Sequence, residues 1–145
     1  MTKRISHHIF LITLFSFFSL HETFNMFFVG DDFGVVYKLQ NSLSYAWPQH
    51  QIVNMFRPLY LIFGTNPTGY FSIGFVVFVL SATIFYFLAR QIFSNESHAL
   101  IAALIYTTAP IGIESVTMML LYIGSYYALA LFSLILIFFL KFLKT

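Results

Sequence analysis

Two adjacent carboxylates, Asp31 and Asp32, are the residues of this chain whose types and spacing are best suited to chemistry. Neighbouring carboxylates repel each other, which favours protonation of one of them and makes the pair a candidate general base or cation site. The alternative is a solvated helix start, in which Gly30 ends the preceding segment and the helix dipole stabilises Asp32. The local sequence leaves both interpretations open.

Two further residues are candidates for substrate binding. Arg57 carries a planar guanidinium, which suits bidentate contact with a phosphate, but the side chain could equally anchor the chain at a membrane surface. Glu114 follows an apolar stretch with no cation nearby, so it is either a functional acid or part of a wet turn. The five histidines show no metal-ligand spacing with an acid, and no metal site is predicted.

The composition indicates an integral membrane protein. Of the 145 residues, 59% are hydrophobic and 8% are charged, whereas a soluble domain carries roughly 25% charged residues. The absence of cysteine excludes disulfides and thiolate metal sites. A net charge of +2 without a basic patch gives no reason to expect a nucleic-acid partner.

Four apolar segments approach the roughly 20 residues that a bilayer requires. They span residues 6–27, 70–89, 98–116 and 121–140. The predicted fold is therefore an all-α membrane protein, a single membrane domain over residues 1–145, with about four transmembrane helices. A long outer loop joins the first two spans at residues 28–69, and apolar residues at helical spacing predict an interfacial helix at about 33–46.

The basic residues orient these spans. With both termini in the cytoplasm, five of the seven basic residues fall on the cytoplasmic side, as the positive-inside rule requires. They are Lys3, Arg4, Arg90, Lys141 and Lys144. The same orientation puts the long loop, with Asp31 and Asp32, outside.

An ordered set of motifs resembles a known family. The set comprises Val-Gly-Asp-Asp-Phe-Gly (29–34), Phe-Arg-Pro-Leu (56–59), Phe-Gly-Thr-Asn-Pro-Thr-Gly-Tyr (63–70), an Ala/Leu-rich segment (99–109) and Pro-x-x-x-Glu (110–114). This order resembles the N-terminal part of the GT-C integral membrane glycosyltransferases, in particular the branch that includes the protein O-mannosyltransferases. The chain departs from the family pattern at Ala109, where His is common.

The resemblance implies transfer of a hexose from a polyprenyl-phosphate donor to a protein, lipid or glycan acceptor on the outer face of a bacterial or archaeal plasma membrane. By position, Asp31 corresponds to a catalytic base, Asp32 to the second acid of the pair, and Glu114 to an acid near the substrates. A role for a divalent metal is left open. Because the family has eight or more spans, the chain is expected to be a fragment, the N-terminal portion of a longer transferase.

Two alternatives come from other functional classes. A small four-span exporter would couple transport to protons through an intramembrane acid, here Glu22. A non-catalytic membrane subunit or remnant would use the long outer loop as a docking surface. Neither alternative requires Asp31 to be a base.

Overall fold

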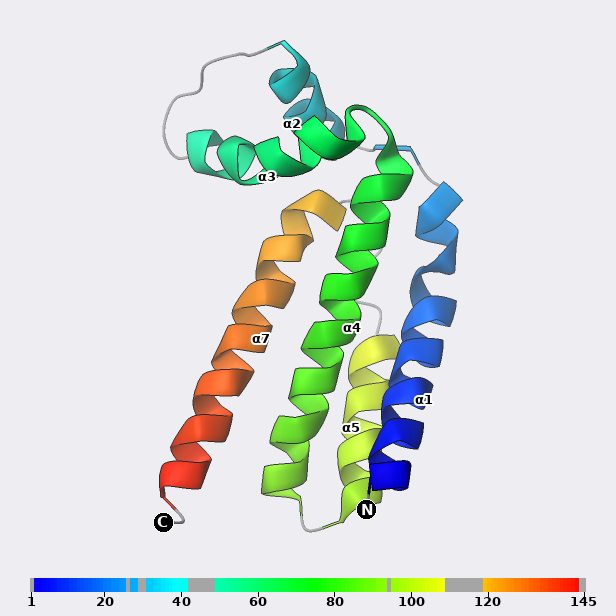
Figure 1. Ribbon diagram of the computed structural model, residues 1–145, viewed down its shortest axis with the longest axis vertical. Helices are drawn as coiled ribbons and strands as arrows, with labels where there is room; N and C mark the ends of the chain where they lie inside the picture. Colours follow the sequence, from blue (N-terminus) through cyan, green and yellow to red (C-terminus); the bar gives the residue numbers. More distant parts are fainter. Residues whose placement is uncertain are drawn as a thin grey trace.

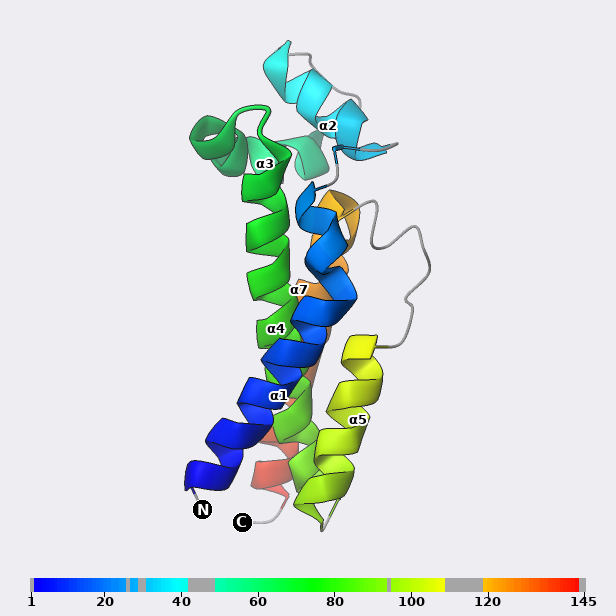
Figure 2. The same ribbon diagram turned by 90° about the vertical axis from the view of Figure 1, so that its right-hand side faces the viewer.

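The computed structural model describes residues 2–25, 27–28, 31–41, 49–93, 95–108 and 119–143, and every regular element in these ranges is a helix. Four helices run along the long axis of the molecule (Figures 1 and 2). They are α1 (Thr2–Leu20), α4 (Pro67–Ile92), α5 (Glu96–Thr108) and α7 (Met119–Phe142). The short 3₁₀ helix η1 (His21–Asn25) continues α1.

Two further helices, α2 (Asp31–Gln40) and α3 (Gln49–Phe63), lie across one end of this bundle (Figure 1). We call it the capped end. At the opposite end α1 begins and α4 and α7 finish, which brings Arg4, Arg90 and Lys141 to that end (Figure 1). We call this the basic end. Three of the five basic residues that predicted the orientation therefore lie at one end of the bundle.

Helix α4 is the helix on which α1, α5 and α7 pack. In the half nearer the basic end, small side chains let the helix backbones approach closely. The buried residues there are Ile12, Ala82, Tyr86, Ala89, Ala99 and Ala103. Close packing of this kind positions polar groups on neighbouring helices within hydrogen-bond distance.

Polar side chains join three helices in this half of the bundle. The Nδ1 atom of His8 lies 2.6 Å from the Tyr86 hydroxyl, which ties α1 to α4. The hydroxyls of Ser81 and Tyr106 lie 3.2 Å apart and join α4 to α5. Arg90 donates to Glu96 across the turn between α4 and α5. These contacts satisfy polar groups that would be costly to bury alone.

The starts of α4 and α5 follow from their capping residues. Asn66 accepts a hydrogen bond from the Thr68 amide at 3.1 Å, with Pro67 in the first turn. Asn95 accepts from the Ser97 amide at 2.8 Å. Both starts agree with the residue types, since asparagine satisfies amide groups that a helix start leaves unpaired.

Two glycines shape the junction between α3 and α4, Gly64 in the turn and Gly69 in the first turn of α4. Gly64 adopts a φ of 55°, a left-handed conformation that favours glycine, and its carbonyl accepts from the Tyr70 hydroxyl at 2.8 Å. Gly69 lies directly against the ring of Phe63, so a Cβ atom at this position would overlap that ring. The turn fixes the angle at which α3 leaves the bundle.

We expect Gly69→Ala to lower the free energy of unfolding by about 2 kcal/mol, because the new methyl group must displace the Phe63 ring. Gly34 is the matched control, since it lies inside α2 and a Cβ atom added to it would have nothing within 4 Å. Gly34→Ala should stabilise α2 by up to about 1 kcal/mol. Unfolding titrations of the purified variants in mixed micelles measure both. A Gly69→Ala protein as stable as the Gly34→Ala protein would contradict the close approach.

Two helices are long and apolar enough to cross a membrane, judged by length and composition: α4 and the Gly124–Phe142 part of α7. Helix α4 has 26 residues and is about 39 Å long, against a hydrocarbon core of about 30 Å. The other two predicted spans do not reach this standard in the described part of the chain. Helix α1 starts with polar and basic residues, and α5 is described for 13 residues, about 20 Å.

The segment predicted to form the outer loop differs in detail from that prediction. The helix predicted at about 33–46 is present as α2, which begins two residues earlier, at Asp31. Residues 42–48, which the prediction partly covered, lie outside the described residues. The following segment forms a helix of 15 residues, α3, despite an internal proline at position 58.

Large apolar side chains are exposed along the bundle. On α7 these side chains form an extended surface. Only 17% of the residues in its apolar window are buried, whereas 44% are buried in the apolar window of α4. The exposed residues on α7 include Leu131, Phe132, Ile135, Phe138, Phe139 and Phe142. An apolar surface of this length is unusual in a soluble monomer and suits contact with lipid or with other helices.

Candidate functional site

The capped end has its own hydrophobic core. Helix α2 contacts α3 and α7, and α3 in turn contacts α4. The core joins all of them through Leu20, Phe28, Val35, Val36, Leu39, Phe56, Tyr70, Phe71, Val77, Phe78 and Tyr126. Helices α2 and α3 are thus packed onto the bundle through apolar side chains.

The acidic pair occupies the first two positions of α2. The Asp32 side chain is 0% exposed, while the side chain of Asp31 lies outside the described set. Residues Phe28, Val35 and Val36, close to Asp32 in the chain, are also buried. Asp32 is therefore at a helix start, as the sequence suggested, but it is not solvated there.

Burial of Asp32 has an energetic consequence. A carboxylate removed from water is costly unless it is paired or hydrogen-bonded, and the amide groups and dipole of a helix N-terminus favour a negative charge. Asp31 is the first residue of the same helix.

Arg57 is exposed on α3, between Pro58 and the buried Phe56. Pro58 lies inside the helix and cannot donate to the carbonyl four residues earlier. The long stem of Arg57 can follow the apolar surface while its guanidinium stays in water or at a headgroup. Asp32 and Arg57 thus belong to two helices that contact each other at the capped end.

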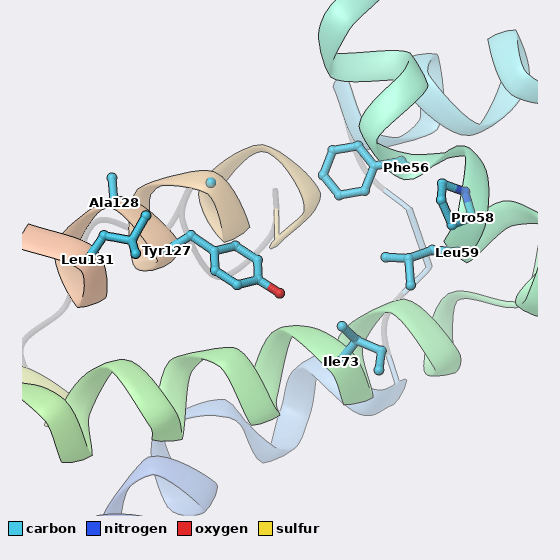
Figure 3. A pocket seen from close by; sticks show the side chains of 8 residues that line it. Phe56, Pro58, Leu59, Ile73, Tyr127, Ala128 and Leu131 are labelled. Carbon is cyan, nitrogen blue, oxygen red and sulfur yellow. The ribbon is translucent and has the colours of Figure 1, made fainter. Parts of the chain in front are cut away.

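An apolar cavity of about 620 Å³ lies between α3, α4 and α7, beneath the capped end. We call it the capped-end cavity. Its lining residues are Phe56, Pro58, Leu59, Ile73, Gly124, Tyr127, Ala128 and Leu131 (Figure 3). Among these eight residues, Tyr127 carries the one polar side-chain group. The cavity has the size of a small-molecule site and suits an apolar ligand.

Figure 3 shows how the cavity relates to the loop. Phe56, Pro58 and Leu59 of α3 face Ile73 of α4, and the Tyr127 ring reaches toward them from α7. Arg57 lies between two of the lining residues in the chain, but it does not itself line the cavity. Tyr127 was not among the residues predicted from the sequence, although it is one of two adjacent tyrosines that follow Gly124 and Ser125.

The remaining candidate acids are separated from this arrangement. Glu114 lies in residues 109–118, outside the described residues. Glu22 has a side chain 86% exposed and lies 4.0 Å from the Nε2 atom of His21. The exporter alternative requires an acid enclosed within the bundle. The carboxylate of Glu22 is exposed on η1 and is not enclosed.

Within the described residues, no group of three or more histidine and acidic residues is arranged to hold a metal ion. Comparisons of the chain with protein-family models, curated proteins and solved structures found no match. The functional assignment therefore rests on the residues and the geometry of the capped end.

Proposed function

We propose that this chain is a multi-spanning membrane protein that transfers a sugar from a polyprenyl-phosphate donor to an acceptor at the capped end. In this proposal the four long-axis helices cross the membrane, with α2 and α3 at its outer surface. The observation that carries the proposal is the combination, at one end of the bundle, of an apolar cavity and an acid-bearing helix start. An exposed arginine follows the lining residue Phe56 in the chain.

The capped-end cavity suits the lipid part of such a donor. A polyprenyl chain is apolar and branched, and the lining residues offer it aliphatic and aromatic contacts. The adjoining apolar surface of α7 would let the chain enter sideways from the bilayer. Arg57, next to the lining residues Phe56 and Pro58, could then contact the donor phosphate through two parallel hydrogen bonds.

The acidic pair supplies the acceptor chemistry. Asp31 takes the proton of an acceptor hydroxyl, whose oxygen attacks the anomeric carbon of the sugar. The bond between that carbon and the phosphate oxygen breaks, and the polyprenyl phosphate leaves with the electron pair. Asp32, buried beside it, holds the start of α2 in place. General base catalysis of this kind contributes about 10²–10⁴-fold to a rate.

Blocking the cavity tests where the donor binds. Ala128 is exposed on α7 and lines the cavity, so Ala128→Trp should fill the space. Crosslinking of a photoreactive polyprenyl-phosphate sugar should fall at least tenfold, which corresponds to a loss of about 1.4 kcal/mol of binding free energy. Ile135→Trp is the matched control, because Ile135 is exposed on α7 outside the cavity. Equal crosslinking of both variants would contradict the donor site.

The proposed topology predicts the labelling of single cysteines, which the chain otherwise lacks. Thr65 is exposed in the turn at the capped end, and Leu143 is exposed at the basic end. In intact cells, Thr65→Cys should react with a membrane-impermeant maleimide, while Leu143→Cys should react only after permeabilisation. The reverse pattern would place the capped end in the cytoplasm and exclude an extracytoplasmic transfer site.

A further inference from the structure

A second cavity lies at the basic end, between the last turns of α4 and α7. Its volume is about 500 Å³, and its lining residues are Phe87, Arg90, Gln91, Leu134, Ile137, Phe138 and Lys141. We call it the basic cleft. The ends of α4 and α7 that form it are visible together in Figure 1. We propose that the basic cleft binds one anionic phospholipid, with the headgroup phosphate between Arg90 and Lys141.

The charge of the cleft favours an anion. Arg90 is in the last turn of α4 and Lys141 in the last turn of α7, so each helix contributes one cation. None of the seven lining residues is acidic. Basic pockets between helix ends at a membrane surface are typical binding sites for anionic lipid headgroups.

Contacts with two neighbouring side chains hold Arg90 in place. Its Nη2 atom donates to Glu96, and its guanidinium lies 5.8 Å from the centre of the Tyr86 ring. A guanidinium carries five N–H donors, so one carboxylate partner does not exhaust its capacity for hydrogen bonds. Because the contacts with Glu96 and Tyr86 restrict the side chain, less conformational entropy is lost when a phosphate binds.

The cleft has a charged end and an apolar wall, as a phospholipid has a charged headgroup and apolar acyl chains. Lys141 lies at the end of α7, while Leu134 lies seven residues earlier, about 10 Å further along the helix axis. Between them, Ile137 and Phe138 continue the apolar wall. A headgroup at Arg90 and Lys141 would therefore extend its acyl chains along the exposed apolar surface of α7. A small soluble anion would leave this wall uncovered.

Native mass spectrometry of the full purified chain tests the proposal, with phosphatidylglycerol and phosphatidylcholine of identical acyl chains as probes. Phosphatidylglycerol should bind about fivefold more tightly, because a cation near a headgroup contributes about fivefold and Glu96 offsets the charge of Arg90. Lys141→Gln should therefore remove most of this preference. It leaves the pairing of Arg90 with Glu96 intact, so the variant does not disturb the contacts between α4 and α5.

Two further variants separate a specific site from general attraction. Arg4 is exposed on α1 at the same end and does not line the cleft, so Arg4→Gln should keep the preference for phosphatidylglycerol. Leu134→Trp keeps both cations but fills the cleft, and it should weaken binding of phosphatidylglycerol. The proposal is overturned if Arg4→Gln and Lys141→Gln have equal effects, or if both lipids bind equally well. It is also overturned if glycerol phosphate, which lacks acyl chains, displaces bound phosphatidylglycerol at equal concentration.

Discussion

Asp31→Asn is expected to lower the rate of sugar transfer about 100-fold or more, the contribution of a general base. Asparagine keeps the size of the side chain and some of its hydrogen bonds, but it cannot accept a proton from the acceptor hydroxyl at neutral pH. Binding of the polyprenyl-phosphate donor should change little, because the donor contacts are assigned to Arg57 and the capped-end cavity. The rate is measured as transfer of a radiolabelled sugar in membranes that contain the protein.

Two comparisons make this result specific. Glu22→Gln removes a carboxylate from an exposed position on η1 and should leave the rate unchanged. Donor crosslinking, measured on the same membranes, reports whether Asp31→Asn still binds the lipid. If Asp31 only caps α2, its replacement should cost about 1 kcal/mol of stability and little activity. An Asp31→Asn protein that transfers sugar at the original rate would remove this residue from the mechanism.

Asp32→Ala should lower the free energy of unfolding by about 3 kcal/mol, because the loss of a buried carboxylate leaves a space and strands the groups that satisfied it. The physical basis is its burial at the start of α2. Glu22→Ala is the matched control, since an exposed acid should change stability by no more than about 0.5 kcal/mol. Unfolding titrations in mixed micelles measure both variants.

The variants of Asp31 and Asp32 are therefore expected to have different defects. Asp31→Asn should impair transfer in a stable protein, whereas Asp32→Ala should impair stability first. Addition of a divalent metal tests whether the two acids hold a cation together. If they do, excess metal should partly restore the transfer rate of Asp32→Asn. An Asp32→Ala protein as stable as the Glu22→Ala protein would contradict the structural role of the buried carboxylate.

Local patterns in the sequence were sufficient to predict several elements. The sequence predicted spans at 70–89 and 98–116, and α4 and α5 begin a few residues earlier, at Pro67 and Glu96. The capping chemistry of Asn66 and Asn95 accounts for these starts. The spacing of Val35, Val36 and Leu39 predicted a helix with one buried face, and all three residues are buried on α2. These features depend on residues within a few positions of each other.

Features built from distant segments could not be predicted in this way. Asp32 is followed by Phe33, yet the acid is buried and the phenylalanine is exposed, because packing of α2 on the bundle decides which side faces inward. The capped-end cavity combines side chains from α3, α4 and α7. The basic cleft likewise joins residues near positions 90 and 140. No local pattern reports these juxtapositions.

Transfer by the purified chain is the most direct test of the proposed function. The chain is reconstituted into liposomes with a radiolabelled polyprenyl-phosphate hexose and a mixture of peptide, glycolipid and glycan acceptors. We predict that label appears in an acceptor, at a rate that Asp31→Asn reduces about 100-fold. Donor that binds and crosslinks at the capped-end cavity, without any label reaching an acceptor above the rate of Asp31→Asn, would contradict the assignment of this chain as a transferase.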